Sequence, residues 1–352
     1  MKIFVTGGAG FIGSNFLNLV VPRHPEHQFV CVDTLTYAAN LANLTAVAEA
    51  SNYAFERIDV ADGPVVRDLF IRYDPDVVVH FAAESHVDRS IASPQGFVRT
   101  NIEGTFQLLE AFRSLEPGPD RLFHHVSTDE VYGSLGTDGL FTESTPYDPS
   151  SPYSASKAAS DHLVRAYGCT YGLQFKLTNC SNNYGPYQFP EKLVPLMILH
   201  AVERKPLPVY GQGLNVRDWL YVEDHCEAIW QVIETGRVGE TYNIGGNSER
   251  TNLEVVRDVC RIVAEETDCA QAELDALITF VEDRPGHDLR YAIDSSKLTR
   301  ECGWEPRESF DSGLRRTVRW YLDNPTWVDQ VRSGEYRRWM EQNYEHRARR
   351  EG

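Results

Sequence analysis

The chain has 352 residues, of which 42% are hydrophobic and 24% are charged, a balance typical of a globular protein. Its formal net charge of −17 argues against nonspecific binding to nucleic acid, because a phosphate backbone attracts basic surfaces. The seven cysteines form no C-x-x-C pattern, and no secretory leader is visible. No apolar run reaches roughly 18 residues, the length of a membrane helix. We therefore expect a soluble cytoplasmic protein.

The amino-terminal segment alternates a strand, a glycine turn, a helix and a second strand. The first strand is expected at residues 2–6, and the second, at residues 29–32, ends in Asp33. Three glycines between them follow the spacing G-x-x-G-x-x-G, namely Gly7, Gly10 and Gly13. This arrangement lets a pyrophosphate approach the backbone at a helix N-terminus, while Asp33 binds a ribose 2′-hydroxyl and repels a 2′-phosphate. The pattern therefore predicts a dinucleotide site with a preference for NAD over NADP.

The same alternation continues to about residue 180. Residues 77–83 are continuously apolar, as in a strand buried on both faces. Other strands are expected at residues 54–58, 121–126 and 174–178, and helices at residues 65–73, 94–115 and 153–171. Strands alternating with helices predict an α/β protein with a Rossmann-type, doubly wound parallel sheet.

The composition changes after Cys180 to a turn-forming, aromatic stretch at residues 181–190. We expect an NAD-binding domain at 1–180, a smaller mixed α/β substrate lobe at 181–330, and a C-terminal tail at 331–352. From Trp320 onward the chain is expected to be helical and to lie on the surface. In the substrate lobe, helices are expected at 193–204 and 255–266 and a strand at 278–281. The lobe itself is made mainly of 181–216 and 248–309, because parts of 217–247 and 310–322 are expected to complete the first domain.

Two adjacent carboxylic acids, Asp129 and Glu130, follow the expected strand at residues 121–126. The carboxyl end of a parallel strand is where ligands bind, and two neighbouring carboxyls can divide into an acid and a base. Thr128 adds a hydroxyl that can hold a substrate oxygen. Taken alone, the pair fits a solvated turn or a helix cap equally well.

Tyr153 and Lys157 lie four residues apart, on one face of an expected helix. A lysine ammonium there is expected to lower the pKa of the phenol, so that Tyr153 can act as a base. The alternative is an exposed pair with no chemical role.

Two arginines, Arg217 and Arg284, are candidate clamps for a diphosphate, and Lys192 can assist them. Each of the three, taken singly, is equally explained as a surface charge. His80, His86, His124 and His125 form no metal-ligand pattern, so we expect no metal.

Together these residues resemble the extended short-chain dehydrogenase/reductase superfamily, and within its nucleotide-sugar 4,6-dehydratase branch the dTDP-glucose 4,6-dehydratase family. The likeness runs from residue 1 to about 322, with Ala39 departing from a frequent glycine. The motifs that carry it are TGGAGFIG (6–13), DTLTYAAN (33–40), AAESHVDRSI (82–91), STDEVYG (127–133), YSASK (153–157), NCSNNYGPYQFPEKL (179–193), RDWLYVEDH (217–225) and DRPGHDLRYAID (283–294).

The resemblance implies two sets of binding residues. Contacts with NAD are implied for Phe11, Ile12, Asp33, Thr34, Leu35, Thr36, Asp59, Val60, Phe81, Ala82, Ala83, Glu84, Ser85, Thr100, Tyr153, Lys157 and Asn183. Contacts with the nucleotide sugar are implied for Ser85, Thr128, Asn182, Lys192, Leu193, Pro208, Val209, Tyr210, Arg217, Asn252, Asp283, Arg284, Pro285, Gly286 and His287.

The implied activity is that of a lyase which dehydrates dTDP-glucose to the 4-keto-6-deoxy sugar. Tyr153 would take the proton of the 4-hydroxyl, Glu130 the C5 proton, and Asp129 would protonate the departing 6-hydroxyl. Lys157 would also hold the nicotinamide ribose. The superfamily further implies a homodimer through the helices near 94–115 and 153–171.

Three other functions fit parts of the pattern. A nucleotide-sugar 4-epimerase shares the cofactor and the Tyr/Lys pair but does not need Asp129 and Glu130. A non-catalytic dinucleotide-binding Rossmann protein leaves Tyr153 and Lys157 unexplained. A GDP-mannose 4,6-dehydratase would be expected to prefer NADP, which Asp33 disfavours.

Overall fold

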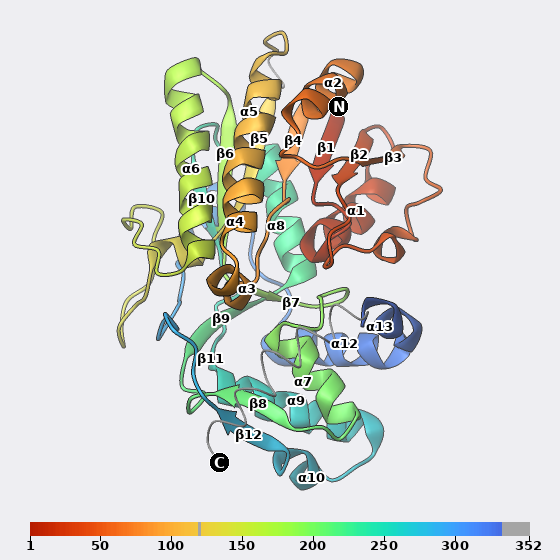
Figure 1. Ribbon diagram of the computed structural model, residues 1–352, viewed down its shortest axis with the longest axis vertical. Coiled ribbons are helices and arrows are strands. Elements are labelled where there is room, and N and C mark those ends of the chain that lie inside the picture. Colours follow the sequence, from red (N-terminus) through yellow and green to blue (C-terminus); the bar gives the residue numbers. More distant parts are fainter. Residues whose placement is uncertain (119–120, 333–352) are drawn as a thin grey trace.

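The computed structural model describes residues 1–118 and 121–332 (Figure 1). Its larger lobe is built on a seven-stranded parallel sheet with the strand order β10-β6-β5-β4-β1-β2-β3. The strands are β1 (Lys2–Thr6), β2 (Gln28–Asp33), β3 (Tyr53–Arg57), β4 (Val77–His80), β5 (Leu122–Thr128), β6 (Phe175–Cys180) and β10 (Thr241–Ile244). This order is that of a doubly wound Rossmann-type fold, as predicted.

Helices cover both faces of this sheet, so its central strands are apolar on both sides. In β1, Ile3 and Val5 belong to one core and Phe4 to the other, because successive side chains point to opposite faces. One face is covered by α1 (Phe11–Arg23), α8 (Val222–Thr235) and α11 (Ser296–Cys302), and the other by α2 (Gly63–Tyr73), α5 (Thr105–Arg113) and α6 (Pro152–Tyr171). Short helical segments are η1 (Leu41–Leu44), α3 (Val87–Ala92), α4 (Gln95–Phe97), η2 (Val98–Gly104) and η3 (Asp129–Tyr132).

The smaller lobe, at the lower side of Figure 1, has two small sheets and its own core. One sheet has the order β11-β9-β7 and the other pairs β12 with β8. The strands are β7 (Asn182–Tyr184), β8 (Leu207–Tyr210), β9 (Val216–Tyr221), β11 (Glu249–Thr251) and β12 (Ile278–Val281). The helices are α7 (Leu193–Val202), α9 (Asn252–Thr267), α10 (Gln271–Asp275), α12 (Phe310–Asp323) and α13 (Pro325–Val331).

Most sequence predictions of elements are confirmed within one to three residues at each end. The strand at 278–281 matches β12, and β10 and α8 do return to the larger lobe. The helix expected at 94–115 runs without a break from Gln95 to Arg113, but residues 98–104 within it form a π-helical segment, η2. The strand expected at 77–83 ends at His80, since residues 81–83 leave the sheet and line a cavity.

One expectation about the C-terminal part was wrong. Helix α12 does not complete the larger lobe; its apolar face packs against α7 and α9, in the core of the smaller one. Helix α13 lies at the surface, as expected, but its inner face is packed: Trp327 is 7% exposed, and its indole Nε1 donates to Asn43 Oδ1 at 2.6 Å. The rest of the expected tail, 333–352, lies outside the described residues.

The described helices were also compared with the requirements of a membrane span. Within residues 1–118 and 121–332, no helix combines the length and the apolar character that crossing a bilayer requires.

Candidate active site

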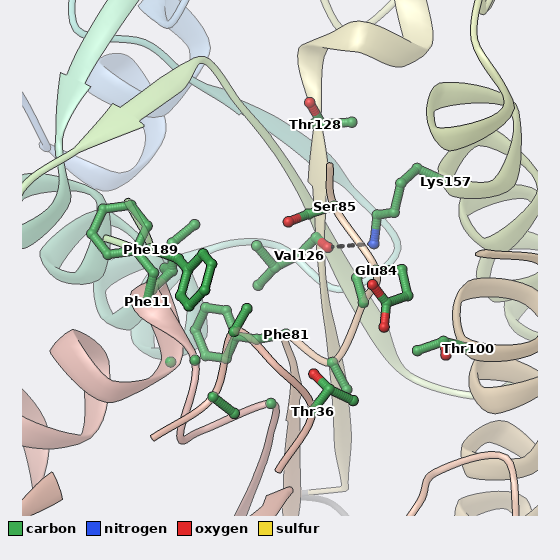
Figure 2. Close-up of a pocket in the computed structure, with 18 of the residues that line it drawn as sticks. Phe11, Thr36, Phe81, Glu84, Ser85, Thr100, Val126, Thr128, Lys157 and Phe189 are labelled. Atoms are coloured by element: carbon green, nitrogen blue, oxygen red, sulfur yellow. Dashed lines mark hydrogen bonds between the residues drawn. The ribbon is translucent and has the colours of Figure 1, made fainter. Parts of the chain in front are cut away.

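A cavity of about 500 Å³ lies at the carboxyl edge of the main sheet (Figure 2). The glycine turn between β1 and α1 forms part of its wall. Gly7 has φ +70°, and a Cβ on it would lie 2.6 Å from the Ala82 nitrogen, so a side chain is excluded there. Gly10 caps α1 without a side-chain hydrogen bond, which leaves the N–H groups of the first turn available to an anion. The turn is thus built for a phosphate group, as the glycine spacing predicted.

Asp33 ends β2 and lines the same cavity. Its carboxylate accepts hydrogen bonds from the backbone N–H of Leu35 at 2.8 Å and of Ala9 at 3.0 Å. Burial raises the pKa of Asp33, and these two hydrogen bonds oppose the rise. The side chain is therefore held in one orientation beside the glycine turn, where an acid is expected to bind a dinucleotide ribose.

Almost all residues predicted to bind the cofactor line this cavity. They are Gly7, Gly10, Phe11, Ile12, Gly13, Asp33, Thr34, Thr36, Asp59, Val60, Phe81, Ala82, Ala83, Glu84, Ser85, Thr100, Tyr153, Lys157 and Asn183. Leu35, at φ +59°, is outside the lining, where it supplies its N–H to Asp33. In Figure 2, Phe11, Phe81 and Phe189 lie on one side of the space, and Lys157, Glu84 and Thr100 on the other.

A second cavity, of about 160 Å³, lies in the smaller lobe and adjoins the first. Glu130, Asn182, Glu191 and Lys192 line both cavities, so the two form one continuous cleft. The predicted substrate residues that line the second cavity are Asn182, Lys192, Leu193, Pro208, Val209, Tyr210, Arg217, Asn252, Arg284 and His287. Ser85 and Thr128 line the first.

Three predicted substrate residues lie beside the second cavity without lining it: Asp283, Pro285 and Gly286. Asp283 instead orients its neighbours, since it accepts from the Arg284 backbone N–H at 2.7 Å and pairs with His287 Nδ1 at 2.6 Å. The sequence analysis missed several lining residues: His86, Val87, Asp88, Glu191, Leu196, Met197 and Trp219. The sequence did offer a signal for four of them. The motif AAESHVDRSI contains His86, Val87 and Asp88, and the motif NCSNNYGPYQFPEKL contains Glu191.

Three cations converge on the second cavity, within a protein of net charge −17. Arg217 donates to the carbonyls of Val216 at 2.7 Å and Asp288 at 3.0 Å, and Lys192 donates to the Ser85 carbonyl at 2.8 Å. Burial lowers the pKa of both Arg217 and Lys192. With Arg284, they make a pocket suited to a diphosphate rather than a set of surface charges.

Asp129 and Glu130 lie in η3, directly after β5, and both line the cleft. Burial raises the pKa of Asp129 well above its ordinary value, and the carboxylates of Glu130 and Asp218 raise it further. Burial also raises the pKa of Glu130, but Arg284, Lys192 and Arg217 oppose that rise. The pKa of both acids is raised, but nearby cations oppose the rise mainly at Glu130, which favours Asp129 as the proton donor and Glu130 as the acceptor.

Tyr153 and Lys157 enter the cleft from the first turns of α6. A capping box between Ser151 and Ser154 fixes the start of this helix, with Pro152 at its first position. Tyr153 is 8% exposed, and Thr128, Asp129, Glu130, Tyr153 and Lys157 all line the larger cavity. The five predicted catalytic residues thus share one cleft.

The pKa of Tyr153 is raised in this structure, and the expected lowering by Lys157 stays a prediction. Burial raises the pKa of Tyr153 well above its ordinary value, and Glu130 and Cys180 add to the rise, while a hydrogen bond with Thr128 opposes it. Lys157 is turned elsewhere, because its Nζ donates to the Val126 carbonyl at 2.9 Å (Figure 2). The protein alone therefore keeps Tyr153 in its phenol form.

The histidines named in the sequence analysis take no part in a metal-like cluster. Within the described part of the chain, one group of three potential ligands has donor atoms within 4.8 Å of one another: His24, Glu26 and His27. It lies between α1 and β2 and lines neither cavity.

Comparison with known proteins agrees with this geometry. The chain is 58% identical to a dTDP-glucose 4,6-dehydratase of Neisseria meningitidis serogroup B, over 96% of this chain and 97% of that protein. The crystal structure of DesIV, a dTDP-glucose 4,6-dehydratase of Streptomyces venezuelae with NAD and TYD bound, superposes with a TM-score of 0.86 at 45% identity, over 94% of this chain and all of that one. A UDP-glucose 4-epimerase of Thermus thermophilus in complex with NAD is more distant, with a TM-score of 0.81 at 30% identity, over 92% of this chain and 100% of that one.

The family model described as GDP-mannose 4,6 dehydratase matches residues 4–317, which cover most of both lobes and the whole cleft. The chain therefore belongs to the GDP-mannose 4,6 dehydratase family of proteins.

Proposed function

We propose that this enzyme is a hydro-lyase that converts dTDP-glucose to dTDP-4-keto-6-deoxyglucose by C4 oxidation, elimination of water from C5 and C6, and return of the hydride to C6. One observation carries the proposal: two neighbouring carboxylic acids in different surroundings, the buried Asp129 and the half-buried Glu130, line the larger cavity, and Glu130 lines the smaller one as well. Elimination of water needs an acid and a base in addition to Tyr153, whereas a 4-epimerase needs neither of these two further groups. The relatives at 53–58% identity are named dTDP-glucose 4,6-dehydratases, which supports the same choice.

The larger cavity fits NAD. A phosphate can meet the free N–H groups at the start of α1, and Asp33 is placed for a ribose hydroxyl. The chemistry that NAD supplies when bound is the acceptance and return of a hydride, together with a positive charge on its oxidised ring. Asp33 disfavours NADP, because its carboxylate would face the extra phosphate.

Tyr153 takes the proton of the 4-hydroxyl in the first step. Because burial and Glu130 raise its pKa, ionisation needs a positive charge nearby. The oxidised nicotinamide fills this need, and Lys157, anchored to Val126, is placed to hold the adjoining ribose. Thr128 holds the sugar oxygen beside Tyr153.

The 4-ketone then acidifies the C5 proton, which Glu130 removes. Asp129, kept protonated by burial, gives its proton to the departing 6-hydroxyl, and water leaves. After the hydride reaches C6, Glu130 returns its proton to C5. One proton has then to pass from Tyr153 to Asp129 before the next turnover, so that the enzyme is unchanged.

The smaller cavity holds the nucleotide diphosphate in this account. Arg217, Arg284 and Lys192 supply the positive charge, and Asn182 and Lys192 line the passage between the cavities. We assign residues 1–180 to the cofactor and the parts 181–216 and 248–309 to the sugar nucleotide.

The direct test is to incubate the purified protein with dTDP-glucose, without added NAD, and to follow the alkali-induced absorbance of a 4-keto sugar. The keto sugar is expected from dTDP-glucose and not from GDP-mannose, the substrate class in the family's description. Formation of the C4 epimer alone, or no product even with NAD supplied, would refute the proposal.

We also propose that the enzyme is a homodimer. Val98, Phe106 and Tyr171, on the neighbouring segments η2, α5 and α6, are 54%, 40% and 54% exposed. Large apolar side chains gathered on adjacent helices are typical of a subunit interface. Light scattering is expected to give twice the chain mass for the wild type and the monomer mass for Phe106→Glu; a monomeric wild type would refute the dimer.

The cysteines support a cytoplasmic setting. All seven are free thiols, and five of them are buried. Free thiols persist in a reducing compartment.

A further inference from the structure

The smaller cavity contains an acid among its cations. Asp88, in α3, lines this cavity, and its side chain is only 4% exposed. Its Oδ2 accepts a hydrogen bond from the Tyr210 hydroxyl at 2.9 Å, and its Oδ1 accepts one from Arg284 Nη1 at 3.1 Å. Tyr210 ends β8 and Arg284 follows β12, so one carboxylate from the larger lobe joins two elements of the smaller lobe.

This acid needs an explanation, because a carboxylate repels a bound diphosphate. A buried ion pair also gives little net stability, since both charges lose their hydration. Holding Arg284 and Tyr210 in place is a role that explains why Asp88 is buried beside Arg284. Arg284 retains further donors: its Nε is buried, and no described residue accepts a hydrogen bond from it. One side of the guanidinium is thus fixed by the protein, while another donor remains for a ligand.

We propose that Asp88 is a positioning residue, which holds Arg284 and Tyr210 in the smaller cavity so that the guanidinium meets the diphosphate of the nucleotide sugar. This inference rests on the proposed function, which places the nucleotide sugar in that cavity. Asp88 does not contact the reacting carbons; it acts through Arg284. Its loss should therefore weaken binding of the nucleotide far more than it slows the chemical steps.

The test is Asp88→Asn, which preserves the shape of the side chain and removes its charge. KM for dTDP-glucose is expected to rise on the order of tenfold, as for the loss of one charge-assisted contact, with kcat changed by about twofold or less. The dissociation constant of dTDP, measured by calorimetry, should rise by a similar factor. The NAD content of the purified variant should equal that of the wild type.

Asp224→Asn is the matched control. Asp224 is also 4% exposed, and its Oδ2 accepts the backbone N–H groups of Arg307 at 3.2 Å and Glu308 at 2.9 Å, but it lines neither cavity. It should leave KM and dTDP affinity unchanged. An Asp88→Asn variant with wild-type KM and dTDP affinity would overturn the inference, as would a loss of kcat without a change in KM.

A double-mutant cycle isolates the route through Arg284. Arg284→Ala should raise KM more than Asp88→Asn does, and the double variant should be no worse than Arg284→Ala alone, because the two residues act as one unit. Additive losses would contradict this route. If Asp88→Asn does not fold, Tyr210→Phe removes the hydroxyl bound by the same carboxylate, and a rise in KM of about threefold is expected.

The two proposals can fail separately. A wild-type enzyme without dehydratase activity would refute the proposed function, whereas dTDP affinity reports on Asp88 without any turnover. If dTDP binds the wild type and Asp88→Asn equally well, only the role of Asp88 is lost.

Discussion

Asp129 and Glu130 are adjacent in the chain, yet different charges surround their carboxyl groups. Glu130 and Asp218 add to the rise in the pKa of Asp129, whereas Arg284, Lys192 and Arg217 oppose the rise in the pKa of Glu130. The smaller cavity, which supplies those cations, is also where the diphosphate is proposed to bind. The cations of the proposed substrate pocket therefore favour Glu130 over Asp129 as the base.

Glu130→Gln should stop the reaction after its first step. The amide cannot take the C5 proton, so kcat for dehydration is expected to fall by about 10³-fold, the usual worth of a general base. Oxidation at C4 should continue, and absorbance at 340 nm should show reduced cofactor accumulating after dTDP-glucose is added. Turnover close to that of the wild type would reject Glu130 as the base.

Tyr153→Phe should block the enzyme one step earlier. Without the hydroxyl, the 4-hydroxyl keeps its proton, so neither keto sugar nor reduced cofactor should form, and kcat should fall by about 10³-fold or more. Affinity for dTDP should be unchanged, because Tyr153 does not line the smaller cavity. Accumulation of reduced cofactor in this variant would contradict the assigned order of the steps.

Asp129→Asn should inactivate the enzyme and yet stabilise the fold at neutral pH. Because the pKa of Asp129 is raised in the folded state, its contribution to the free energy of unfolding is fully present below the ordinary pKa of 3.8. That contribution is lost as the pH rises through the pKa of the folded state. The amide avoids this loss, so Tm at pH 8 should exceed that of the wild type by about 2 °C or more, the shift that about 1 kcal/mol produces in a chain of this size. Thermal unfolding at several pH values measures the effect, which should shrink toward pH 4.

Asp161→Asn is expected to behave in the opposite way. Burial raises the pKa of Asp161, but hydrogen bonds from His125 and Ser127 outweigh it, and the net pKa is lowered. The contribution of Asp161 to the free energy of unfolding is therefore present above the ordinary pKa of 3.8. It is lost as the pH falls through the pKa of the folded state. The variant should lose about 2 kcal/mol at pH 7, because the Ser127 and Tyr147 hydroxyls also lose a charged acceptor. Equal Tm shifts for the two variants would contradict the opposite pKa directions.

Asp33→Asn should weaken retention of the cofactor. The amide is a poorer acceptor for a ribose hydroxyl and no longer repels a 2′-phosphate, so NAD affinity should fall by about tenfold and NADP should begin to support activity. The NAD content after purification and its titration back into the apoenzyme measure both effects. Asp62→Asn, at the exposed cap of α2, should retain NAD like the wild type.

Local sequence patterns predicted the larger lobe well. The run Val77–His80 is apolar on both faces, and the glycines at 7, 10 and 13 stand between β1 and α1. The placement of α12 could not be predicted in the same way, because the period of a helix shows which face is apolar but not what covers it. The π-helical turn at residues 98–104 likewise leaves no mark in a hydrophobic pattern.

The grouping of the proposed catalytic residues in one cavity could be predicted, but their protonation could not. Strand ends and motif spacing placed Asp129, Glu130 and Tyr153 together. The pKa of Tyr153 depends on burial and on Glu130, and Lys157 donates to a carbonyl of another strand. Asp88 was missed for a related reason, since its partners lie 122 and 196 residues away in the chain.

The most direct measurement follows the hydrogen that leaves C4. If dTDP-glucose carrying deuterium at C4 is converted in ordinary water, the deuterium is expected at C6 of the keto sugar, with no consumption of added NAD. Deuterium found in the solvent, retained at C4 of an epimer, or left on the cofactor in stoichiometric amount would contradict an internal transfer of hydride that enables the elimination.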